Sequence, residues 1–214
     1  MHLTERKRLQ QGFFIVFEGL DGSGKTTQAA LLKEFLDKKG YDAILLREPT
    51  KGPSGEKIKR LLSNGRKGIS PQEELNLFIE DRKENIDTNI IPAMKDNKVI
   101  IQDRYYFSTI AYQGALGINP QEIRVMNEAF AIKPDLVFYL EIKPDLGLKR
   151  IEAGRQGKRD AFEKEHYLVK VKEIFDSFTD PFIKKINGSL PPGSIQKDIN
   201  EITIEKLFLL TINN

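Results

Sequence analysis

Short apolar runs alternate along this chain with longer segments whose apolar residues recur every three or four positions. The short runs are predicted strands: Phe13–Glu18, Ala43–Arg47, Lys98–Asp103, Leu136–Ile142 and, with the weakest pattern, Ile183–Asn187. Near-continuous apolar strands are typical of parallel sheets, which are buried on both faces. The alternation therefore predicts an α/β fold in which a parallel five-stranded sheet is covered by helices on both faces.

The longer segments are predicted helices, at about Lys25–Lys39, Gly55–Asn64, Pro71–Lys95, Phe107–Leu116, Pro120–Ala131, Pro144–Ala153, Phe162–Asp176 and Ser194–Leu210. No repeat, low-complexity tract or long linker divides them. We therefore expect one domain over residues 13–214, preceded by a short extension at residues 1–12. The basic segment GRQGKRD, residues 154–160, has few apolar anchors and is predicted to be a mobile loop between two helices.

Composition and charge exclude several classes of protein. The 34 basic and 31 acidic residues give a formal net charge of +3, which is too small to indicate nucleic acid as a partner. The chain has no cysteine, so disulfides, thiolate metal sites and cysteine nucleophiles are excluded, and the cytoplasm is the expected location. Two histidines, His2 and His166, cannot form a multi-histidine metal site. No apolar run approaches the about 20 residues of a membrane span, and the polar N-terminus does not resemble a signal peptide.

A glycine-rich turn follows the first predicted strand. Its sequence GLDGSGKT fits the phosphate-binding pattern G-x-x-x-x-G-K-[ST], with a strand before it and a helix after it. Glycines let backbone N–H groups converge on a phosphate, Lys25 is expected to face solvent and reach the β- and γ-phosphates, and the Thr26 hydroxyl can bind Mg²⁺. A plain turn is the alternative, but it does not require this spacing. The predicted ATP-binding residues are Gly19, Leu20, Asp21, Gly22, Ser23, Gly24, Lys25, Thr26 and Thr27.

Two charged residues end the third predicted strand. Asp103 is expected at the carboxyl edge of the sheet beside the glycine-rich turn, where it can bind Mg²⁺ together with Thr26. Arg104 follows and has the planar guanidinium that binds phosphate through two hydrogen bonds. An ion pair that only caps the strand is the alternative. The chain lacks the N/T-K-x-D pattern of guanine-specific switches and the LSGGQ signature of ABC transporters, which weakens both of those interpretations.

Five segments resemble the thymidylate kinase family in order and spacing: FEGLDGSGKTTQ, LLREP, LNLFIEDRKENI, VIIQDRYYFSTIAYQG and KPDLVFYLEIKPDLGLKRI. The resemblance covers nearly all of residues 13–178. It implies a P-loop nucleoside monophosphate kinase-like fold and an enzyme that uses Mg²⁺ and ATP to phosphorylate dTMP to dTDP, as a homodimer joined through helices. Another nucleotide or deoxynucleoside kinase, a non-catalytic ATP-binding module and an inactive scaffold are the alternatives.

The resemblance also assigns residues that bind the acceptor. Phe78 matches the aromatic residue that stacks on thymine, and Arg82 matches the arginine that hydrogen-bonds a base carbonyl. Their i, i+4 spacing puts both on one face of a helix. A donor directed at O4 disfavours cytosine, whose amino group would be left unpaired. For Phe78, the alternative is an ordinary core residue of an amphipathic helix.

Further positions follow from the same resemblance. Tyr112 would occupy the space that a ribose 2′-OH needs, which selects deoxyribose. Asp21 and Glu48 match acidic residues near the sugar and the metal. The base- and sugar-facing positions after the Asp-Arg-Tyr segment are Ser108, Thr109, Tyr112 and Gln113.

The chain departs from the family pattern in one loop. Thr50, Lys51 and Gly52 stand where the family usually has Gly-Gly-Thr. The approach of this loop's backbone to the acceptor phosphate is therefore in question. Lys51 either contacts that phosphate or is solvated, and we favour the solvated side chain.

The source of a catalytic arginine can be predicted by elimination within the family. Some members carry this arginine in the P-loop, and others supply it from the lid that closes over the site. The P-loop positions concerned here, residues 21–23, contain no basic residue, whereas the loop at residues 154–160 contains Arg155 and Arg159. We predict that one of these two, with Arg159 favoured, contacts the transferring phosphoryl group; a solvated basic loop is the alternative.

Overall fold

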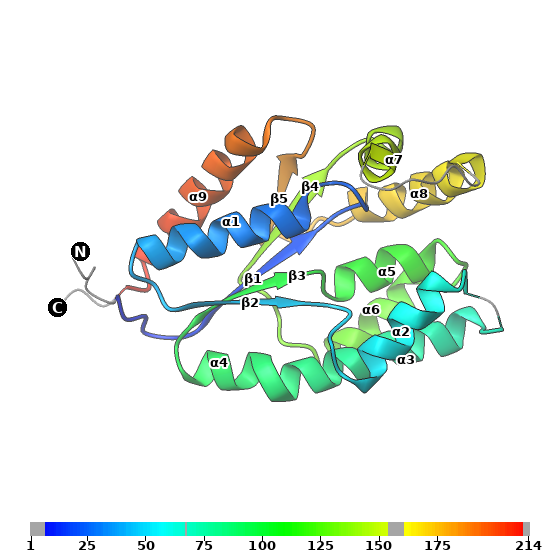
Figure 1. Ribbon diagram of the computed structural model, residues 1–214. Helices are drawn as coiled ribbons and strands as arrows, with labels where there is room; N and C mark the ends of the chain where they lie inside the picture. Colours follow the sequence, from blue (N-terminus) through cyan, green and yellow to red (C-terminus); the bar gives the residue numbers. More distant parts are fainter. Residues whose placement is uncertain (1–6, 67, 154–160, 212–214) are drawn as a thin grey trace.

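The computed structural model describes residues 7–66, 68–153 and 161–211 (Figure 1). Its strands are β1 (Phe13–Glu18), β2 (Ala43–Arg47), β3 (Val99–Asp103), β4 (Leu136–Glu141) and β5 (Ile183–Asn187). Its helices are α1 (Lys25–Lys38), α2 (Pro53–Ser63), α3 (Pro71–Asn85), η1 (Ile86–Ile90), α4 (Ile91–Lys95), α5 (Tyr106–Gly114), α6 (Pro120–Glu128), α7 (Pro144–Ala153), α8 (Ala161–Asp176) and α9 (Pro192–Phe208). Every predicted strand and helix occurs within a few residues of its predicted bounds.

Within the described ranges, the five strands form one parallel sheet in the order β2-β3-β1-β4-β5, so the predicted architecture is confirmed. β1 lies in the middle, with Phe17 opposite Asp103 of β3 and Glu18 opposite Tyr139 of β4. Because all strands run the same way, their carboxyl ends lie at one edge, towards α5, α7 and α8 in Figure 1. The crossovers diverge to opposite sides of β1 at this edge, which is where open α/β sheets bind ligands.

The sheet separates two hydrophobic cores, and β1 contributes to both. Phe13, Ile15 and Phe17 pack with apolar residues of α1 and α9. Phe14 and Val16, which alternate with them, pack with residues of α3 to α6 and α8. Figure 1 shows the same division, with α1 and α9 on one side of the sheet and α3, α4 and α5 on the other. Burial on both faces explains why β1 is apolar without alternation.

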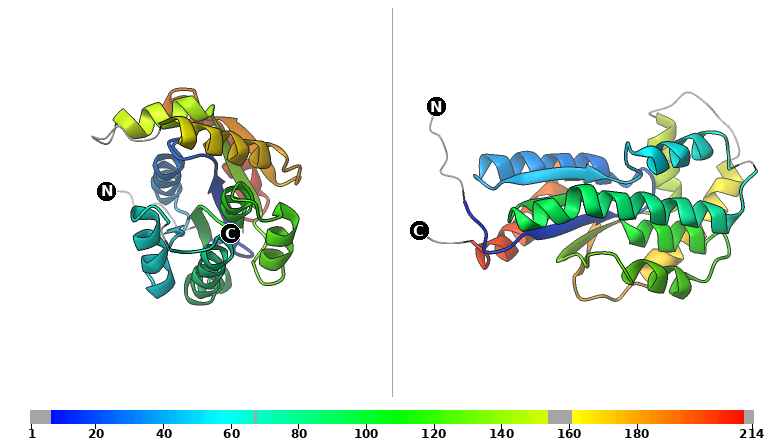
Figure 2. Two further views of the ribbon diagram at one scale, coloured as in Figure 1. Left: turned by 90° about the vertical axis from the view of Figure 1, so that its right-hand side faces the viewer. Right: turned by 90° about the horizontal axis from the view of Figure 1, so that it is seen from below.

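The predicted helix Pro71–Lys95 is interrupted by a π-helical turn. Ser70 caps its start in a reciprocal arrangement with Glu73, and regular α-helix ends at Asn85, where the π turn η1 begins. Pro92 lacks the N–H that would bond the Thr88 carbonyl in an α-helix, which accounts for a local change in pattern. Figure 2 shows that the segment nevertheless continues as one long rod from α3 into α4.

The described part of the N-terminal extension packs against the sheet's amino end. Lys7 bridges to Tyr41 in parallel, and Leu9 bridges to Thr211 in antiparallel fashion. Leu9 is buried and joins the core formed with α1 and α9. Over the residues that the structure describes, no helix combines the length and apolar character needed to cross a membrane.

Candidate active site

The glycine-rich turn between β1 and α1 approaches neighbouring backbone so closely that only glycine fits. A Cβ atom on Gly22 would lie 2.4 Å from the Gly147 carbonyl oxygen, and one on Gly19 would lie 2.6 Å from the Leu140 carbonyl oxygen. Gly24, the residue before α1, has φ 98°, in the left-handed region that favours glycine. Apart from the chain neighbours of Gly24, no atom of the described residues lies within 4 Å of a Cβ built on this glycine, so the space beside the start of α1, where the positive end of the helix dipole can attract phosphate, is open.

Lys25 is buried, contrary to our expectation that it faces solvent: its residue is only 4% exposed. Its side chain folds back under the turn, and Nζ donates hydrogen bonds to the Leu20 carbonyl oxygen (2.6 Å) and to Ser23 Oγ (3.2 Å). Burial, together with the neighbouring Arg104 cation, lowers the pKa of Lys25 to about 7. A phosphate bound in the turn would favour the charged form of this lysine.

The other predicted P-loop residues differ in what they expose. Leu20 is fully buried and Ser23 nearly so, so only their backbone groups can face a nucleotide. Thr26 and Thr27 are exposed.

Thr26 and Asp103 meet at the carboxyl edge of the sheet. Thr26 Oγ1 donates a hydrogen bond to Asp103 Oδ2 at 2.6 Å. Asp103 Oδ1 is buried and has no hydrogen-bond partner among the described residues. A hydroxyl and a carboxylate are hard oxygen ligands, which fit Mg²⁺, and this ion commonly takes its other ligands from water and substrate phosphates. The described part of the chain holds no group of three or more His, Cys, Asp or Glu side chains placed to bind a metal.

Arg104 follows β3 with φ 70°, in a region that residues with a side chain rarely occupy. Its Nη2 pairs with Asp21 Oδ1, and its Nη1 donates to Ser108 Oγ at 2.9 Å. The Asp21 carboxylate is partly exposed, and the Arg104 and Lys25 cations outweigh its desolvation by the surrounding protein and hold its pKa below the usual value. We call the residues gathered here the P-loop cluster: Asp21, Lys25, Thr26, Asp103, Arg104 and Ser108.

Tyr112 and Gln113 on α5 extend this cluster. Tyr112 Oη accepts a hydrogen bond from the Asp21 backbone N–H at 3.0 Å, and its ring centroid lies 5.3 Å from the Arg104 guanidinium carbon. Gln113 is 1% exposed, and neither polar atom of its side chain has a partner in the described chain. Because an unpaired buried amide is unfavourable, Gln113 is a candidate for contact with a bound ligand.

Arg82 of α3 is the centre of a second, fully buried group. Its Nη2 lies 2.7 Å from Glu48 Oε2 and 3.0 Å from Thr109 Oγ1, and its Nη1 lies 2.5 Å from Asn127 Oδ1. Only Nε has no partner among the described residues. Burial raises the pKa of Glu48, against the attraction of the Arg82 cation. We call these residues, together with Asn85, which bonds Glu48, the Arg82 cluster.

Phe78 lies one helical turn before Arg82 and belongs to neither hydrophobic core. Its side chain is half-buried. Part of the ring is therefore free to contact a ligand beside the Arg82 cluster.

The loop that departs from the family pattern is held by a buried carboxylate. The Thr50 backbone N–H and Oγ1 donate to Asp81 at 3.0 and 2.6 Å, and Asp81 directly precedes Arg82. Lys51 is exposed. The threonine thus anchors the loop to α3, while the solvated side chain that we favoured for Lys51 agrees with its exposure.

Four buried polar residues of the site were missed from the sequence: Glu18, Asn85, Gln102 and Asn127. Glu18 accepts hydrogen bonds from the backbone N–H groups of Tyr105 (2.8 Å) and Ser108 (3.1 Å). Burial raises the pKa of Glu18 to about 7, despite these bonds. A polar residue inside an apolar strand, such as Gln102 in VIIQD, was the one available signal. Arg155 and Arg159 lie outside the described residues.

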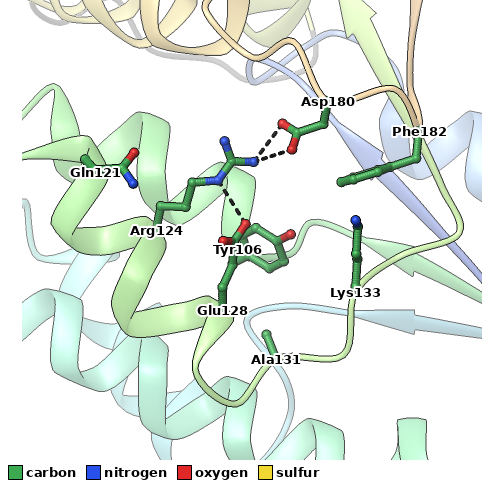
Figure 3. A pocket seen from close by; sticks show the side chains of 8 residues that line it. All are labelled: Tyr106, Gln121, Arg124, Glu128, Ala131, Lys133, Asp180 and Phe182. Atoms are coloured by element: carbon green, nitrogen blue, oxygen red, sulfur yellow. Dashed lines mark hydrogen bonds and ion pairs between the residues drawn. The ribbon is translucent and has the colours of Figure 1, made fainter.

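A separate hollow of about 460 Å³ is lined by residues that belong to neither cluster (Figure 3). Arg124 projects into it from α6, with Nη2 2.7 Å from both carboxylate oxygens of Asp180 and Nε 2.9 Å from Glu128 Oε1. Its charge is therefore already neutralised, and the pairing ties α6 to the loop before β5. The lining residues are Tyr106, Gln121, Arg124, Glu128, Ala131, Lys133, Asp180 and Phe182.

The parallel sheet, the glycine-rich turn and the P-loop cluster define a P-loop kinase of the nucleoside monophosphate kinase-like fold. A family model described as thymidylate kinase matches residues 17–199, so the chain belongs to the thymidylate kinase family. The thymidylate kinase of Desulfotalea psychrophila is 44% identical over 188 residues, covering 88% of this chain and 92% of the relative. The probable thymidylate kinase of Archaeoglobus fulgidus is 40% identical over 200 residues, covering 94% and 98%. The crystal structure of thymidylate kinase from Ehrlichia chaffeensis superimposes with a TM-score of 0.73 at 27% identity, covering 90% of this chain and 98% of that one.

Proposed function

We propose that this chain transfers the γ-phosphoryl group of ATP to dTMP, giving ADP and dTDP. One observation carries the proposal: a complete P-loop, the Thr26–Asp103 pair and Arg104 meet at the carboxyl edge of β1 and β3. Because the chain belongs to the thymidylate kinase family, we infer that dTMP is the acceptor of the transferred phosphoryl group. The product is a nucleoside diphosphate, so the enzyme is a transferase of nucleotide biosynthesis.

The reaction requires charge neutralisation and alignment more than proton transfer. The acceptor is an oxygen of the dTMP phosphate, which is ionised at neutral pH, so no general base is needed. The P-loop backbone and Lys25 hold the phosphates of ATP, while Arg104 binds the phosphate of dTMP. Two anions that repel each other are thereby brought into line.

Mg²⁺ is the metal that we propose for this site, bound through Thr26 and Asp103. When bound, it supplies positive charge to the phosphate oxygens of ATP. The hydrogen bond between the two residues fixes their side chains at the edge of the sheet. Asp103 Oδ1, buried and without a partner in the described chain, is the free ligand atom.

The acceptor base is assigned to the region between the two clusters. Phe78 offers the face of its ring to thymine, and Arg82 offers a donor to the base carbonyl through the one nitrogen that has no partner in the described chain. Tyr112, held against the P-loop by Asp21, selects deoxyribose by occupying the space of a 2′-OH. Glu48, Ser108, Thr109 and Gln113 complete the proposed substrate-binding set, together with Asp21.

The remaining catalytic group is assigned to Arg155 or Arg159. Arg104 is already engaged by Asp21 and Ser108, so an additional guanidinium is needed to follow the phosphoryl group as it moves. Arg159 is favoured of the two.

We further propose that the enzyme acts as a homodimer in the cytoplasm. α2 and α6 expose apolar side chains, namely Leu62 (38%), Val125 (60%) and Met126 (40%). Exposed apolar helix surfaces are typical of interfaces. Light scattering should give a mass of about twice the 24.5 kDa of one chain.

A coupled ADP-release assay with purified protein tests the function. The acceptors are dTMP, dUMP, UMP and dCMP at equal concentration, with ATP and Mg²⁺. We expect the highest kcat/KM with dTMP. Preference for another acceptor would make the protein a different nucleotide kinase, and ATP binding without transfer to any acceptor would make it a non-catalytic ATP-binding module.

A further inference from the structure

The backbone of Arg104 is anchored on both sides. Its N–H donates to the Phe17 carbonyl oxygen of β1 at 3.0 Å. Its carbonyl oxygen accepts a hydrogen bond from Gln102 Nε2 at 2.8 Å. A left-handed conformation at a residue with a side chain is unfavourable and persists only where its surroundings hold it. The bond from Gln102 is therefore one of the contacts that keep Arg104 in this conformation.

Gln102 is an unusual residue for its place in the fold. It lies in β3, where the other strand residues before Asp103 are apolar, and it is 0% exposed. Burying an amide is unfavourable unless both of its ends are hydrogen-bonded. Gln102 meets this condition, because Nε2 reaches Arg104 while Oε1 accepts from Asn85 Nδ2 at 3.2 Å.

Asn85 continues the chain of contacts into the Arg82 cluster. Its Nδ2 also donates to Glu48 Oε1 at 3.1 Å, and its Oδ1 accepts from Asn89 at 3.1 Å. Glu48 Oε2 in turn pairs with Arg82. All of Asn85's polar atoms are thus bonded at the junction where α3 passes into the π turn, so its side chain has one well-defined orientation.

We propose that Gln102 is a positioning residue: it fixes the backbone of Arg104 and, through Asn85 and Glu48, links the P-loop cluster to the Arg82 cluster. This inference rests on the proposed function, in which Arg104 binds the acceptor phosphate. Gln102 itself need not touch a nucleotide. It affects acceptor binding and turnover by setting the orientation of the Arg104 side chain.

The first experiment replaces Gln102 by methionine, which has a similar volume but no hydrogen-bonding amide. We expect kcat with dTMP to fall and the dTMP Kd to rise, each by about tenfold, because small displacements of a phosphate-binding group have large effects. The KM for ATP should change less than twofold. The matched control is Gln28→Met, which removes another buried amide bond to a backbone carbonyl, that of Pro192 at 3.0 Å. It should lower stability without changing kcat or Kd.

The second experiment is a double-mutant cycle read by calorimetric dTMP binding. If Gln102 acts through Arg104, Gln102→Met should change the dTMP Kd less than twofold when Arg104 is already methionine. The full tenfold effect in that background, or a loss of melting temperature in Gln102→Met without any change in Kd or kcat, would overturn the inference.

Two precautions keep this test interpretable. If Gln102→Met does not fold, Gln102→Leu takes its place, since leucine likewise has no amide that could bond Arg104 or Asn85; it should show the same pattern, and an unchanged Kd and kcat would count against the inference. Wild-type turnover with dTMP tests the proposed function, whereas only the ratios between variants test Gln102.

Discussion

The P-loop cluster and the Arg82 cluster are both rich in charge, but they are built differently. The P-loop cluster takes most of its side chains from two short sequence segments, residues 19–26 and 103–104, and rests on backbone conformation at Gly24 and Arg104. The Arg82 cluster takes its side chains from α3, α5, α6 and the loop after β2, and all of them are buried.

Because of this difference, we expect substitutions in the two clusters to differ in how strongly they affect turnover and stability. In the P-loop cluster, Asp21 and Thr26 are exposed, so substitutions at these two residues should alter turnover more than folding; Lys25, Asp103 and Ser108 of the same cluster are buried. In the Arg82 cluster, a buried ion pair is surrounded by protein, and removing one partner leaves the other charged and desolvated. Substitutions there should alter the free energy of unfolding as well as acceptor binding.

The largest effect is expected for the double variant Arg155→Met and Arg159→Met. Because Arg104 is fixed by Asp21 and Ser108, a second guanidinium is needed at the moving phosphoryl group. We expect kcat to fall about 10³-fold, with the dTMP Kd and melting temperature nearly unchanged. The measurements are the coupled assay, calorimetry and thermal unfolding.

Lys149→Met serves as the control for this variant. Lys149 is a basic residue of α7 whose side chain is 74% exposed, and its replacement should leave kcat unchanged. An unchanged kcat in the double variant would show that neither arginine is catalytic.

Lys25→Met tests whether a buried residue of the P-loop cluster contributes to turnover and not to stability. The lysine is buried, and its pKa, lowered to about 7, indicates that this position disfavours the charged form. We expect kcat to fall by about 10²- to 10³-fold while the protein unfolds at the same temperature or higher, because desolvation of a charge is relieved. Lys33→Met on the same helix, which removes a partly exposed pair with Asp37, is the control. A melting temperature lowered by many degrees would indicate a structural role for Lys25.

The two clusters differ in how much of them the sequence predicts, because they are built from different kinds of segment. The P-loop spacing is contiguous, so the strand, the turn and the helix could all be predicted, and with them the meeting of Thr26 and Asp103 at one sheet edge. The burial of Lys25 could not, because it depends on a side chain folding back under its own turn. Gln102 was missed because it is one polar residue in an apolar strand, and Asn85 was missed because it is one of many polar residues in its helix. Their pairing also joins different elements. The π turn before Pro92 was also not predicted, because the sequence there follows the periodicity of a helix.

Arg82→Met tests the stability side of the comparison. It leaves Glu48 buried with a charge and without its cation, so we expect the free energy of unfolding in urea to fall by about 3–5 kcal/mol. Arg124→Met is the matched control, since Arg124 is also ion-paired, to Glu128 and Asp180, but its side chain is 21% exposed. Its loss should be no more than about 1 kcal/mol. Equal losses for the two arginines would show that full burial does not make the Arg82 ion pair more important for stability than a partly exposed one.

Phe78→Ala tests acceptor binding beside the Arg82 cluster without removing a charge. Loss of stacking should raise the dTMP KM by an amount equivalent to about 1–3 kcal/mol and leave the ATP KM nearly unchanged. Phe35→Ala, at another half-buried phenylalanine on α1, should leave both KM values unchanged. If Phe78→Ala instead unfolds the protein while the remaining folded fraction binds dTMP normally, the residue is part of the core.

A dependence of stability on pH is expected at Glu18, a buried carboxyl group beneath the P-loop cluster. Its pKa is raised from 4.5 to about 7 in the folded protein. Between these values the folded state holds a proton that the unfolded state has lost, so the contribution of Glu18 to stability is present in full below about pH 4.5 and is lost as the pH rises through about 7. The slope is at most about 1.4 kcal/mol per pH unit.

Glu18→Gln should remove this dependence, because the amide stays neutral and its oxygen can still accept from the N–H groups of Tyr105 and Ser108. Urea unfolding at several pH values between 4.5 and 8 measures the difference between wild type and variant. We expect the variant to gain stability relative to wild type as the pH rises, whereas Glu201→Gln, an exposed substitution on α9, should follow the wild-type curve. A wild-type curve parallel to that of Glu18→Gln would mean that Glu18 titrates alike in both states. The P-loop cluster would then rest on a carboxylate that is stabilised by its hydrogen bonds in spite of its burial.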